Sequence, residues 1–201
     1  MALRNILIEG DSLLRKRSRE ITEITDRIKT LAEDMWETLC DADGVGLAAP
    51  QVGVLRRLVV IDVTRPEPEE EEEEEETDAG IENQNEEKAE GEGEEETPET
   101  NGKQTKFLLI NPEIIEVSEE TITGNEGCLS VPGMVGVVTR FMRIKVRALD
   151  LEGNEFELEG EGLLAKALQH EIDHLDGVLY IDIAESVTSV QTEPEPEENS
   201  E

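Results

Sequence analysis

Apolar residues recur along residues 24–43 with the spacing of an amphipathic helix. They fall three or four positions apart, at Ile24, Ile28, Leu31, Met35 and Leu39. This period places them on one face of an α-helix, and Gly44 directly after the run is typical of a helix end. Residues 162–175 form a second, more apolar helical pattern, closed by Asp176 and Gly177. We expect a long helix near the N-terminus and a buried helix near the C-terminus.

Short runs with strand character lie between and around these two segments. They cover residues 58–63, 107–110, 114–123 and 141–150, and one more short strand follows the turn at 152–154. In the run 141–150 charged residues alternate with apolar ones, which indicates a strand with one face in water. The pattern predicts a single α+β domain, a mainly antiparallel β framework around the buried C-terminal helix. We place this domain at residues 1–65 and 101–185.

Most of the negative charge lies outside this pattern. The 201-residue chain has a formal net charge of −33. Residues 66–100 contain about 19 acidic side chains against the single Lys88, and the last eleven residues add about five more; the remainder carries about −10, ordinary for a soluble domain. With Ile81 as its only large apolar residue, the stretch 66–100 cannot bury enough surface to offset its ordering entropy. We expect a disordered acidic insertion at 66–100 and a disordered acidic tail at 186–201.

The location of the protein is suggested by what the sequence lacks. It has no apolar run of 18 residues, so a membrane span is not expected. Its first ten residues lack the charged, apolar and cleavage regions of a secretory signal. Cys40 and Cys128 are far apart, so reduced thiols in the cytosol are the simplest interpretation, and Cys40 is expected to pack in the core. We predict a cytoplasmic protein.

Both histidines of the chain lie in the sequence HEIDH at residues 170–174. Residues four apart share a helical face, so His170 and His174 can bind one metal ion. Glu171 can then reach a water on that ion as a general base. A surface helix with two neutral histidines is the alternative. The flanking residues are apolar, however, and a buried imidazole pair needs partners, so we favour a metal site.

A catalytic metal site usually has three protein ligands and one open position. The chain has no third histidine. Two candidates remain for the third ligand: Glu185, at the spacing of a zinc peptidase, and Cys128, which lies among glycines that allow close backbone approach. A glycine-flanked cysteine alone is more often structural, but beside a two-histidine helix a metal-bound thiolate is favoured.

Residues 44–51, GVGLAAPQ, form a run of small residues that ends in Gln51. Small residues allow the main chain to lie close to a substrate. The amide of Gln51 can donate a hydrogen bond to developing negative charge, as acyl transfer requires. A glycine turn after the first helix explains Gly44 equally well.

Together these segments resemble the three motifs of peptide deformylases, GxGxAAxQ, EGCLS and QHExDHLxG. Here they read GVGLAAPQ at 44–51, EGCLS at 126–130 and QHEIDHLDG at 169–177, in that order. The similarity runs from residue 2 to residue 179 and leaves out only the acidic insertion and the tail. Three matching motifs are far more specific than HExxH alone. The resemblance implies a deformylase-like fold and a hydrolase that removes the N-formyl group from the initiator methionine of nascent polypeptides and releases formate.

The resemblance also implies roles for individual residues. One divalent metal ion, by preference Fe²⁺ and otherwise Zn²⁺ or Ni²⁺, would have three ligands: Cys128, His170 and His174. Glu171 would take a proton from metal-bound water, the hydroxide would attack the formyl carbon, and Glu171 would pass the proton to the leaving amine. Gln51 and the backbone N–H of Leu129 would stabilise the oxyanion.

The methionine side chain of the substrate needs an apolar pocket. Leu163 and Ala167 lie seven and three residues before His170, on its helical face. With Val45 and Gly46 of the first motif they are the predicted substrate-binding residues.

Contacts to the rest of the peptide are less well defined by the sequence. Some deformylases have an arginine shortly after the cysteine motif, where this chain has Val135. Arg140, further on, is kept as a peptide-binding candidate.

Two other functions stay open from the sequence. A zinc peptidase with the HExxH motif would leave EGCLS unexplained and would not depend on Cys128. A catalytically inactive acidic binding protein would use the enzyme fold as a scaffold. The acidic tail is a poor partner for phosphate, so even a transient ribosome contact is disfavoured and no specific nucleic acid is expected.

Overall fold

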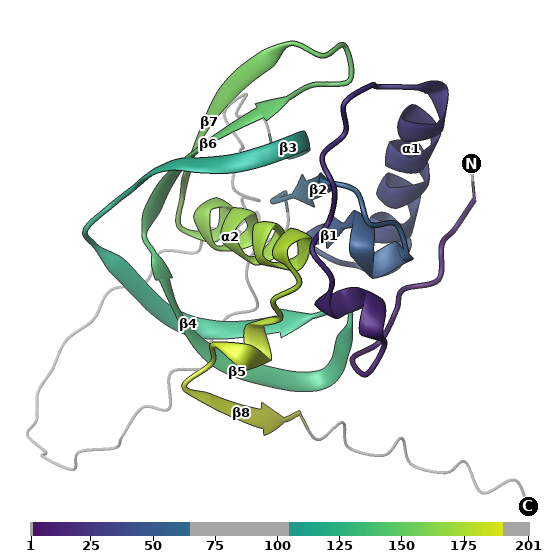
Figure 1. The fold of residues 1–201 in the computed structure, drawn as a ribbon. Helices are drawn as coiled ribbons and strands as arrows, with labels where there is room; N and C mark the ends of the chain where they lie inside the picture. Colours follow the sequence, from purple (N-terminus) through teal and green to yellow (C-terminus); the bar gives the residue numbers. More distant parts are fainter. Residues whose placement is uncertain (1, 65–104, 191–201) are drawn as a thin grey trace, which may run out of the picture. The chain divides into compact units, whose positions relative to one another are not determined.

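Two antiparallel sheets form the framework of the protein (Figure 1). The computed structural model describes residues 2–64 and 105–190. The five-stranded sheet has the order β1-β2-β3-β6-β7, with β1 at Gly46–Ala48, β2 at Leu58–Asp62, β3 at Lys106–Val117, β6 at Arg143–Leu149 and β7 at Glu155–Glu161. The three-stranded sheet has the order β4-β5-β8, with β4 at Thr121–Cys128, β5 at Val131–Phe141 and β8 at Ser186–Ser189. The predicted antiparallel framework is confirmed.

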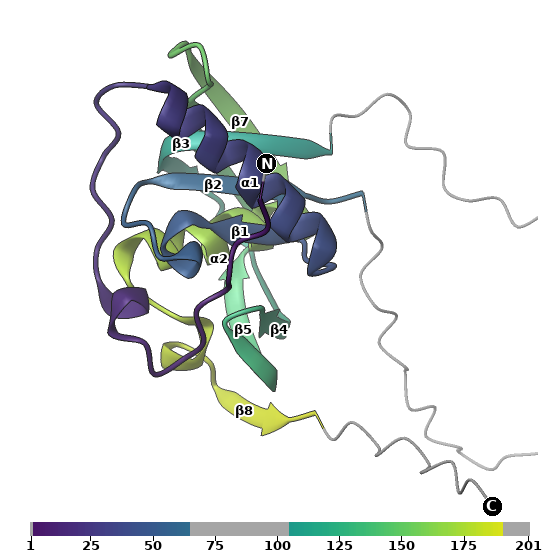
Figure 2. The ribbon, with the colours of Figure 1, turned by 90° about the vertical axis from the view of Figure 1, so that its right-hand side faces the viewer.

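Two α-helices accompany the sheets. These are α1 at Asp26–Asp41 and α2 at Leu163–Asp176, together with the short 3₁₀ helices η1 at Ser12–Arg15, η2 at Ala49–Val52 and η3 at Tyr180–Asp182. In Figure 1, α2 lies between the five-stranded sheet and the β4–β5 hairpin, and Figure 2 shows α1 on the far side of β1 and β2 from α2.

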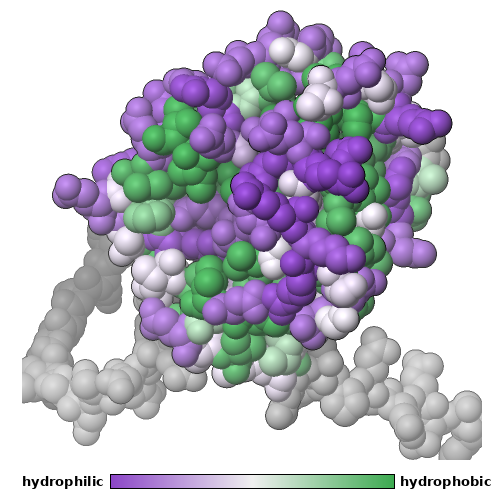
Figure 3. Space-filling view, in the orientation of Figure 1, coloured by the Kyte–Doolittle hydropathy of each residue, from purple (hydrophilic) through white to green (hydrophobic). Residues whose placement is uncertain are grey.

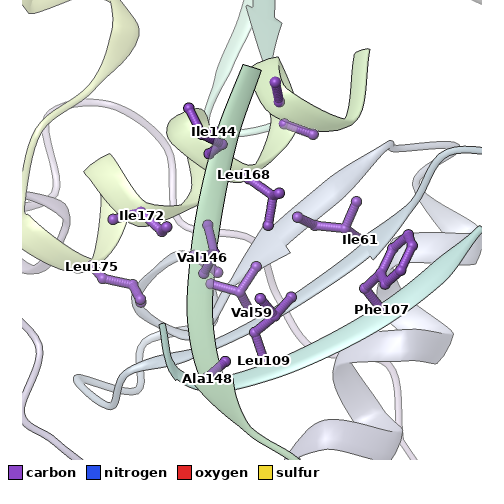
Figure 4. Packing of buried hydrophobic residues seen from close by; sticks show 13 residues of the cluster. Val59, Ile61, Phe107, Leu109, Ile144, Val146, Ala148, Leu168, Ile172 and Leu175 are labelled. Carbon is purple, nitrogen blue, oxygen red and sulfur yellow. The ribbon is translucent and has the colours of Figure 1, made fainter. Parts of the chain in front are cut away.

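Strand β2 is buried on both faces and separates two parts of the core. Val59 and Ile61 point toward α2, where they pack with residues of β3 and β6 (Figure 4). Leu58 and Val60 point the other way and pack with the apolar face of α1. Side chains alternate between the faces of a strand, so the continuous apolar run at 58–62 serves both layers. The five-stranded sheet therefore provides an apolar face against which α2 packs.

The outer strands β6 and β7 confirm the prediction of a wet face. The charged residues of β6 face solvent while Ile144, Val146 and Ala148 are buried. Lys145 lies between Glu157 and Glu159 of β7, with Nζ–carboxylate distances of 3.2 and 3.3 Å. Hydrophilic side chains likewise cover much of the molecular face drawn in Figure 3, with smaller hydrophobic areas between them.

The two helices differ from their predicted places. The long N-terminal helix expected at 24–43 is not borne out, since α1 begins two residues later and ends two residues earlier than that segment. Thr25 is its N-cap, and the left-handed Asp43 (φ 55°) follows its end. Helix α2 is not the last element, because η3 and β8 follow it.

The strand boundaries after residue 106 also differ from the prediction. The expected strands 107–110 and 114–123 are replaced by a continuous β3 and a separate β4. The pattern is broken at Asn111 and Pro112, but the strand continues through them with a register shift between Ile110 and Glu113. Asn111 takes a positive φ of 51° there, which asparagine tolerates. Strand β5 was not predicted, since Pro132, Gly133 and Gly136 interrupt its alternation.

The segment 186–189 was expected in a disordered tail, and this expectation is wrong. These residues form β8, which pairs with β5 from Met134 to Val137. The small and β-branched sequence Ser-Val-Thr-Ser suits an edge strand. The predicted insertion at 66–100 and the rest of the tail, 191–201, lie outside the described residues.

Two further expectations can be compared with the fold. Cys40 is exposed and does not pack in the core, because it lies off the helical face that carries Met35 and Leu39. Within residues 2–64 and 105–190, no helix combines the length and the hydropathy that a membrane span requires.

Candidate metal centre and active site

Helix α2 carries both histidines into the interior. Gly162 at its N-cap (φ 57°, ψ −125°) and Gly177 at its C-cap (φ 80°) bound the helix, and both take backbone conformations that favour glycine. The helix packs against β1, β2, β5 and β7. Consequently His174 is 1% exposed, and the rings of His170 and His174 lie edge to face with their centroids 4.9 Å apart.

Cys128 reaches the histidines from the other side. It is the last residue of β4, directly before the tight connection to β5, and its backbone pairs with Val131. Its Sγ lies 3.3 Å from Nε2 of His174. Within the described residues, one ligand atom from each of Cys128, His170 and His174 lies within 4.8 Å of the others. Glu185, the other candidate ligand, instead accepts a hydrogen bond from Thr139 on the surface.

A metal ion fits this set of donors. One soft thiol and two imidazoles form a donor set suited to Zn²⁺, Fe²⁺ or Ni²⁺. The Nδ1 of His170 lies 2.9 Å from a carboxylate oxygen of Glu126, which orients the ring and leaves its other nitrogen for a metal. Burial, and then the positive charge of His170, lower the pKa of His174 well below its usual value. Burial would also lower the pKa of His170, but hydrogen bonds with Cys128 and Glu126 outweigh it and raise that pKa to about 10, so a metal ion at this site would have to displace the proton of His170.

Gln51 lies beside Cys128 in a fixed orientation. It is the third residue of η2, and it is 1% exposed. Its side-chain oxygen accepts the backbone N–H of Ala48 at 2.7 Å, so its NH₂ group faces the cysteine. That group lies 3.6 Å from Sγ of Cys128 and donates to Oγ of Ser130 at 3.1 Å. A polar donor is therefore held beside the three possible ligands.

Glu171 is buried between α2 and β1. The residue is 4% exposed, and its carboxylate lies against the backbone of Gly46. Among the described residues, its Oε2 is a buried oxygen with no hydrogen-bond partner. Burial raises the pKa of Glu171 to about 7. An unpaired carboxylate with this pKa is suited to exchange protons near neutral pH.

A buried ion-pair network contacts His170 through Glu126. Arg140 donates to both carboxylate oxygens of Glu126 at 2.8 and 3.0 Å, and to Asp173 at 2.6 Å. Burial alone would raise the pKa of Glu126, but the hydrogen bond with His170 and the contact with Arg140 outweigh it and lower that pKa to about 2. Glu126 therefore stays ionised and holds His170 in place.

Only some of the predicted substrate-binding residues pack together in the structure. Val45 and Ala167 pack in the same apolar cluster beside α2, together with Leu164. Leu163 is half-buried at the first position of α2 and is not a member of that cluster. Leu129 follows Cys128, and its side chain points toward Gly44. The side chain of Arg140 is 6% exposed and its guanidinium forms ion pairs with two carboxylates, which favours a supporting role over a substrate contact.

Comparison with known proteins identifies the family of the chain. The sequence profile of the family described as polypeptide deformylase matches residues 3–190. This chain belongs to the polypeptide deformylase family. A peptide deformylase of Lachnoclostridium phytofermentans is 48% identical over 182 residues, which cover 90% of this chain and 89% of that protein. One from Thermomicrobium roseum is 40% identical over 200 residues, with 100% and 96% of the two chains covered.

Solved structures of deformylases have the same fold. The crystal structure of the Thermotoga maritima peptide deformylase superposes with a TM-score of 0.69 at 36% identity, over 92% of this chain and 99% of that one. The Synechococcus elongatus enzyme in complex with actinonin gives a TM-score of 0.70 at 31% identity, over 91% and 79% of the chains. Polypeptide deformylases are metal-dependent hydrolases that remove the N-formyl group from nascent peptides, and the activity of this chain is of that kind.

The sequence pattern alone does not point to the two acidic residues of the network. Glu126 opens the EGCLS motif, and Asp173 lies inside HEIDH. A role for Asp173 could have been inferred from its position three residues after His170, on the same side of the helix. The pairing of Glu126 with Arg140 depends on the β4–β5 register, which the sequence did not reveal.

Proposed function

We propose that the chain removes the formyl group from formyl-methionyl polypeptides with Glu171 as the general base. Cys128, His170 and His174 would hold one divalent metal ion, and a bound metal ion of this kind lowers the pKa of water from 15.7 toward about 7. The observation that carries the proposal is the position of Cys128 beside the two histidines, because a peptidase of the HExxH class would not use it.

Three protein groups would carry out the proton transfers and stabilise the developing negative charge. Glu171 takes a proton from the attacking water, the new C–O bond forms at the formyl carbon, and the C–N bond breaks as Glu171 gives the proton to the amine. The NH₂ group of Gln51, whose orientation Ala48 fixes, donates to the carbonyl oxygen as negative charge grows there. The backbone N–H of Leu129 is the second donor in this proposal.

We propose that the methionine side chain enters between β1 and the start of α2. Val45, Gly46, Leu163 and Ala167 would line this entrance, and the apolar cluster behind Val45 and Ala167 supports it. Nascent formyl-Met polypeptides in the cytoplasm would be the substrates, with no lasting contact to ribosomes because of the acidic charge.

Fe²⁺ is the metal that we propose first, with Zn²⁺ and Ni²⁺ as alternatives. Ferrous iron and a thiolate ligand are both oxidisable, so the iron-loaded protein is expected to lose activity in air faster than the nickel-loaded protein. Metal analysis of protein purified without oxygen, with activity followed in air and under argon, tests this choice. Equal lifetimes for both forms in air would contradict it.

The function is tested by measuring formate release from a short formyl-methionyl peptide. Glu171→Ala is expected to keep its metal and to lose roughly 10²–10⁴ in turnover, the usual contribution of a general base. Cys128→Ser is expected to lose metal binding itself. Near-normal turnover of Glu171→Ala, or a fully loaded and active Cys128→Ser protein, would refute the proposal and would return the peptidase to consideration.

A further inference from the structure

The second glycine of the GVGLAAPQ segment lies against the carboxylate of Glu171. A Cβ atom built on Gly46 would lie 2.4 Å from Oε1 of Glu171, and 2.8 Å from both Cδ and Cγ of the same side chain. All three separations are far shorter than a carbon normally tolerates, since favourable contacts lie at about 3.5–4.0 Å. Gly46 does not need the left-handed backbone region, so space alone requires glycine here.

Neither partner in this contact is free to move away. Gly46 belongs to β1, where it pairs with Ile61 of β2, and the following Leu47 and Ala48 are 0% exposed. Glu171 is 4% exposed on α2, between two histidines that have their own contacts. Because Cγ is involved as well as the carboxylate, rotating the end of the side chain would not relieve the clash.

Gly44, two residues earlier, provides a contrast. A Cβ there would meet Leu39 and Leu129 at 2.8 and 2.9 Å, but both contacts are with terminal methyl groups of flexible side chains. The close approach to a reactive group is therefore a feature of Gly46 itself and is not shared by every glycine of the segment.

We propose that Gly46 is a positioning residue for Glu171: the absence of a side chain at this point of β1 sets where the carboxylate lies. This inference rests on the proposed role of Glu171 as general base. It assigns the small size of Gly46 to the needs of a catalytic side chain, whereas the sequence alone suggested space for the substrate. The buried Oε2 of Glu171 fits the idea, because among the described residues no hydrogen bond fixes this oxygen and the close approach of the Gly46 backbone limits where the side chain can lie.

The test is a double-mutant cycle of Gly46→Ala with Glu171→Ala, followed by thermal melting and by formate release. Gly46→Ala alone is expected to lower the melting temperature by on the order of 5 °C, the effect of overpacking. In the Glu171→Ala background the same change is expected to cost at most about 1 °C, because the side chain it clashes with is gone. Melting does not depend on turnover, so this arm holds even if Glu171 is not the base.

Kinetics give the second readout. Gly46→Ala is expected to lose about 100-fold in kcat with KM changed less than about threefold, since a misplacement near 1 Å can cost that much. A rise in KM with kcat preserved would instead show that Gly46 serves only the methionine entrance proposed above, and would overturn its positioning role. Glu171→Ala could keep full turnover while Gly46→Ala still lowers the melting temperature less in that background. The proposed function would then fail, but the steric contact between Gly46 and Glu171 would be supported.

Gly124→Ala is the matched control. It places the same methyl group on β4, where its nearest neighbour would be Nζ of Lys166 at 3.4 Å, an ordinary contact. Its small effect on the melting temperature is expected to be the same with Glu171 and with Glu171→Ala.

If Gly46→Ala cannot be purified, recovery of the double variant supports the proposal. Equal losses in both backgrounds, an unrecoverable double variant, or a Gly46→Ala protein that melts and turns over like the unmodified protein would overturn it.

Discussion

At the scale of single residues, the charge of Arg140 is balanced inside the protein. Its guanidinium contacts Glu126 and Asp173, and Glu126 in turn contacts the ligand His170. Removing one partner of a buried ion pair leaves an uncompensated charge, which costs about 3–5 kcal/mol. Arg140 therefore ties the stability of the fold to the placement of a metal ligand.

Arg140→Leu is expected to lower the free energy of unfolding by about 3–5 kcal/mol, because the buried Glu126 and the half-buried Asp173 lose their partner. Arg140→Lys keeps the charge but not the forked geometry, so a smaller loss is expected. Urea unfolding of the two variants measures both. A stable Arg140→Leu protein with a raised KM would instead support the peptide contact that the sequence suggested.

The residues with chemistry could be predicted because their types are rare and their spacing is regular. Two histidines four apart, with a glutamate between them, already imply a shared helical face. The choice of Cys128 over Glu185, by contrast, needed either the family resemblance or the structure, since 42 residues separate Cys128 from His170. The burial of Arg140 could not be predicted at all, because the sequence does not show which carboxylates lie around it.

At the scale of elements, Asp34 and Thr38 of α1 hold the N-terminal segment, and the hydroxyl of Thr38 accepts the backbone N–H of Arg4 at 3.0 Å. Asp34 accepts the backbone N–H of Ala2 at 2.8 Å and a forked pair from Arg4 at 3.1 and 2.8 Å. The backbone hydrogen bond to Ala2 leads the causes that lower the pKa of Asp34, with Arg4 contributing and burial opposing. Asp34 thus binds two residues of this segment, Ala2 and Arg4.

Because the pKa of Asp34 is lower in the folded state, its contribution to stability is present above the unfolded value of about 3.9 and is lost as the pH falls below it. We expect the unmodified protein to be more stable than Asp34→Asn at pH 6, and the difference to shrink toward pH 2. Denaturant unfolding at several pH values measures this. A difference that stays constant with pH would show that shape, and not charge, matters at this position.

The end of α2 depends on a glycine for two separate reasons. Gly177 has a φ of 80°, and a Cβ on it would lie 2.7 Å from the backbone carbonyl of Arg15. Gly133 has a similar φ of 71°, but nothing lies within 4 Å of a Cβ there. The pair therefore separates the cost of the backbone conformation from the cost of a clash.

Gly133→Ala is expected to lose only about 1–2 kcal/mol, the cost of a left-handed residue with a side chain. Gly177→Ala adds a clash with backbone atoms that cannot rotate away, so a loss larger by about 1–3 kcal/mol is expected. Thermal melting ranks the two variants. Equal losses would mean that the loop at Arg15 yields easily to the end of α2.

Elements could be predicted where one period dominates, as in α1, α2, β2 and β6. Strands β5 and β8 could not, because their stability depends on partners distant in sequence. Strand β8 is four exposed residues long and exists as a strand through its pairing with β5. Edge strands of this kind have little apolar pattern of their own.

At the scale of the whole molecule, the long acidic stretch connects two strands that already lie side by side. Asp62 at the end of β2 pairs with Lys106 at the start of β3, and the backbone N–H of Val63 donates to the carbonyl oxygen of Thr105 at 2.9 Å. Antiparallel neighbours can be joined by two residues. The length of the segment between them is therefore not required by the fold.

We predict that deleting residues 66–100 leaves folding and chemistry intact and changes only long-range electrostatics. The deletion retains Asn101 and Gly102, a pair that favours a tight hairpin turn between β2 and β3. Loop closure changes by only about 0.6 kcal/mol for each doubling of length, so stability is expected to change little. Turnover of a small neutral formyl peptide is expected to stay within about twofold, because the predicted site lies on β1, β4, η2 and α2.

Association with polyanions, unlike turnover, is expected to change after the deletion, because the deleted stretch carries a charge of about −18. The shortened protein is expected to bind ribosomes or heparin more strongly at low salt, and the difference is expected to vanish near 1 M salt, where the Debye length is about 3 Å. A variant of full length with the run Glu69–Glu76 changed to glutamine separates charge from length, since it should shift binding in the same direction without shortening the connection. A tenfold loss of turnover or a large fall in melting temperature after the deletion would show that residues 66–100 take part in the working structure.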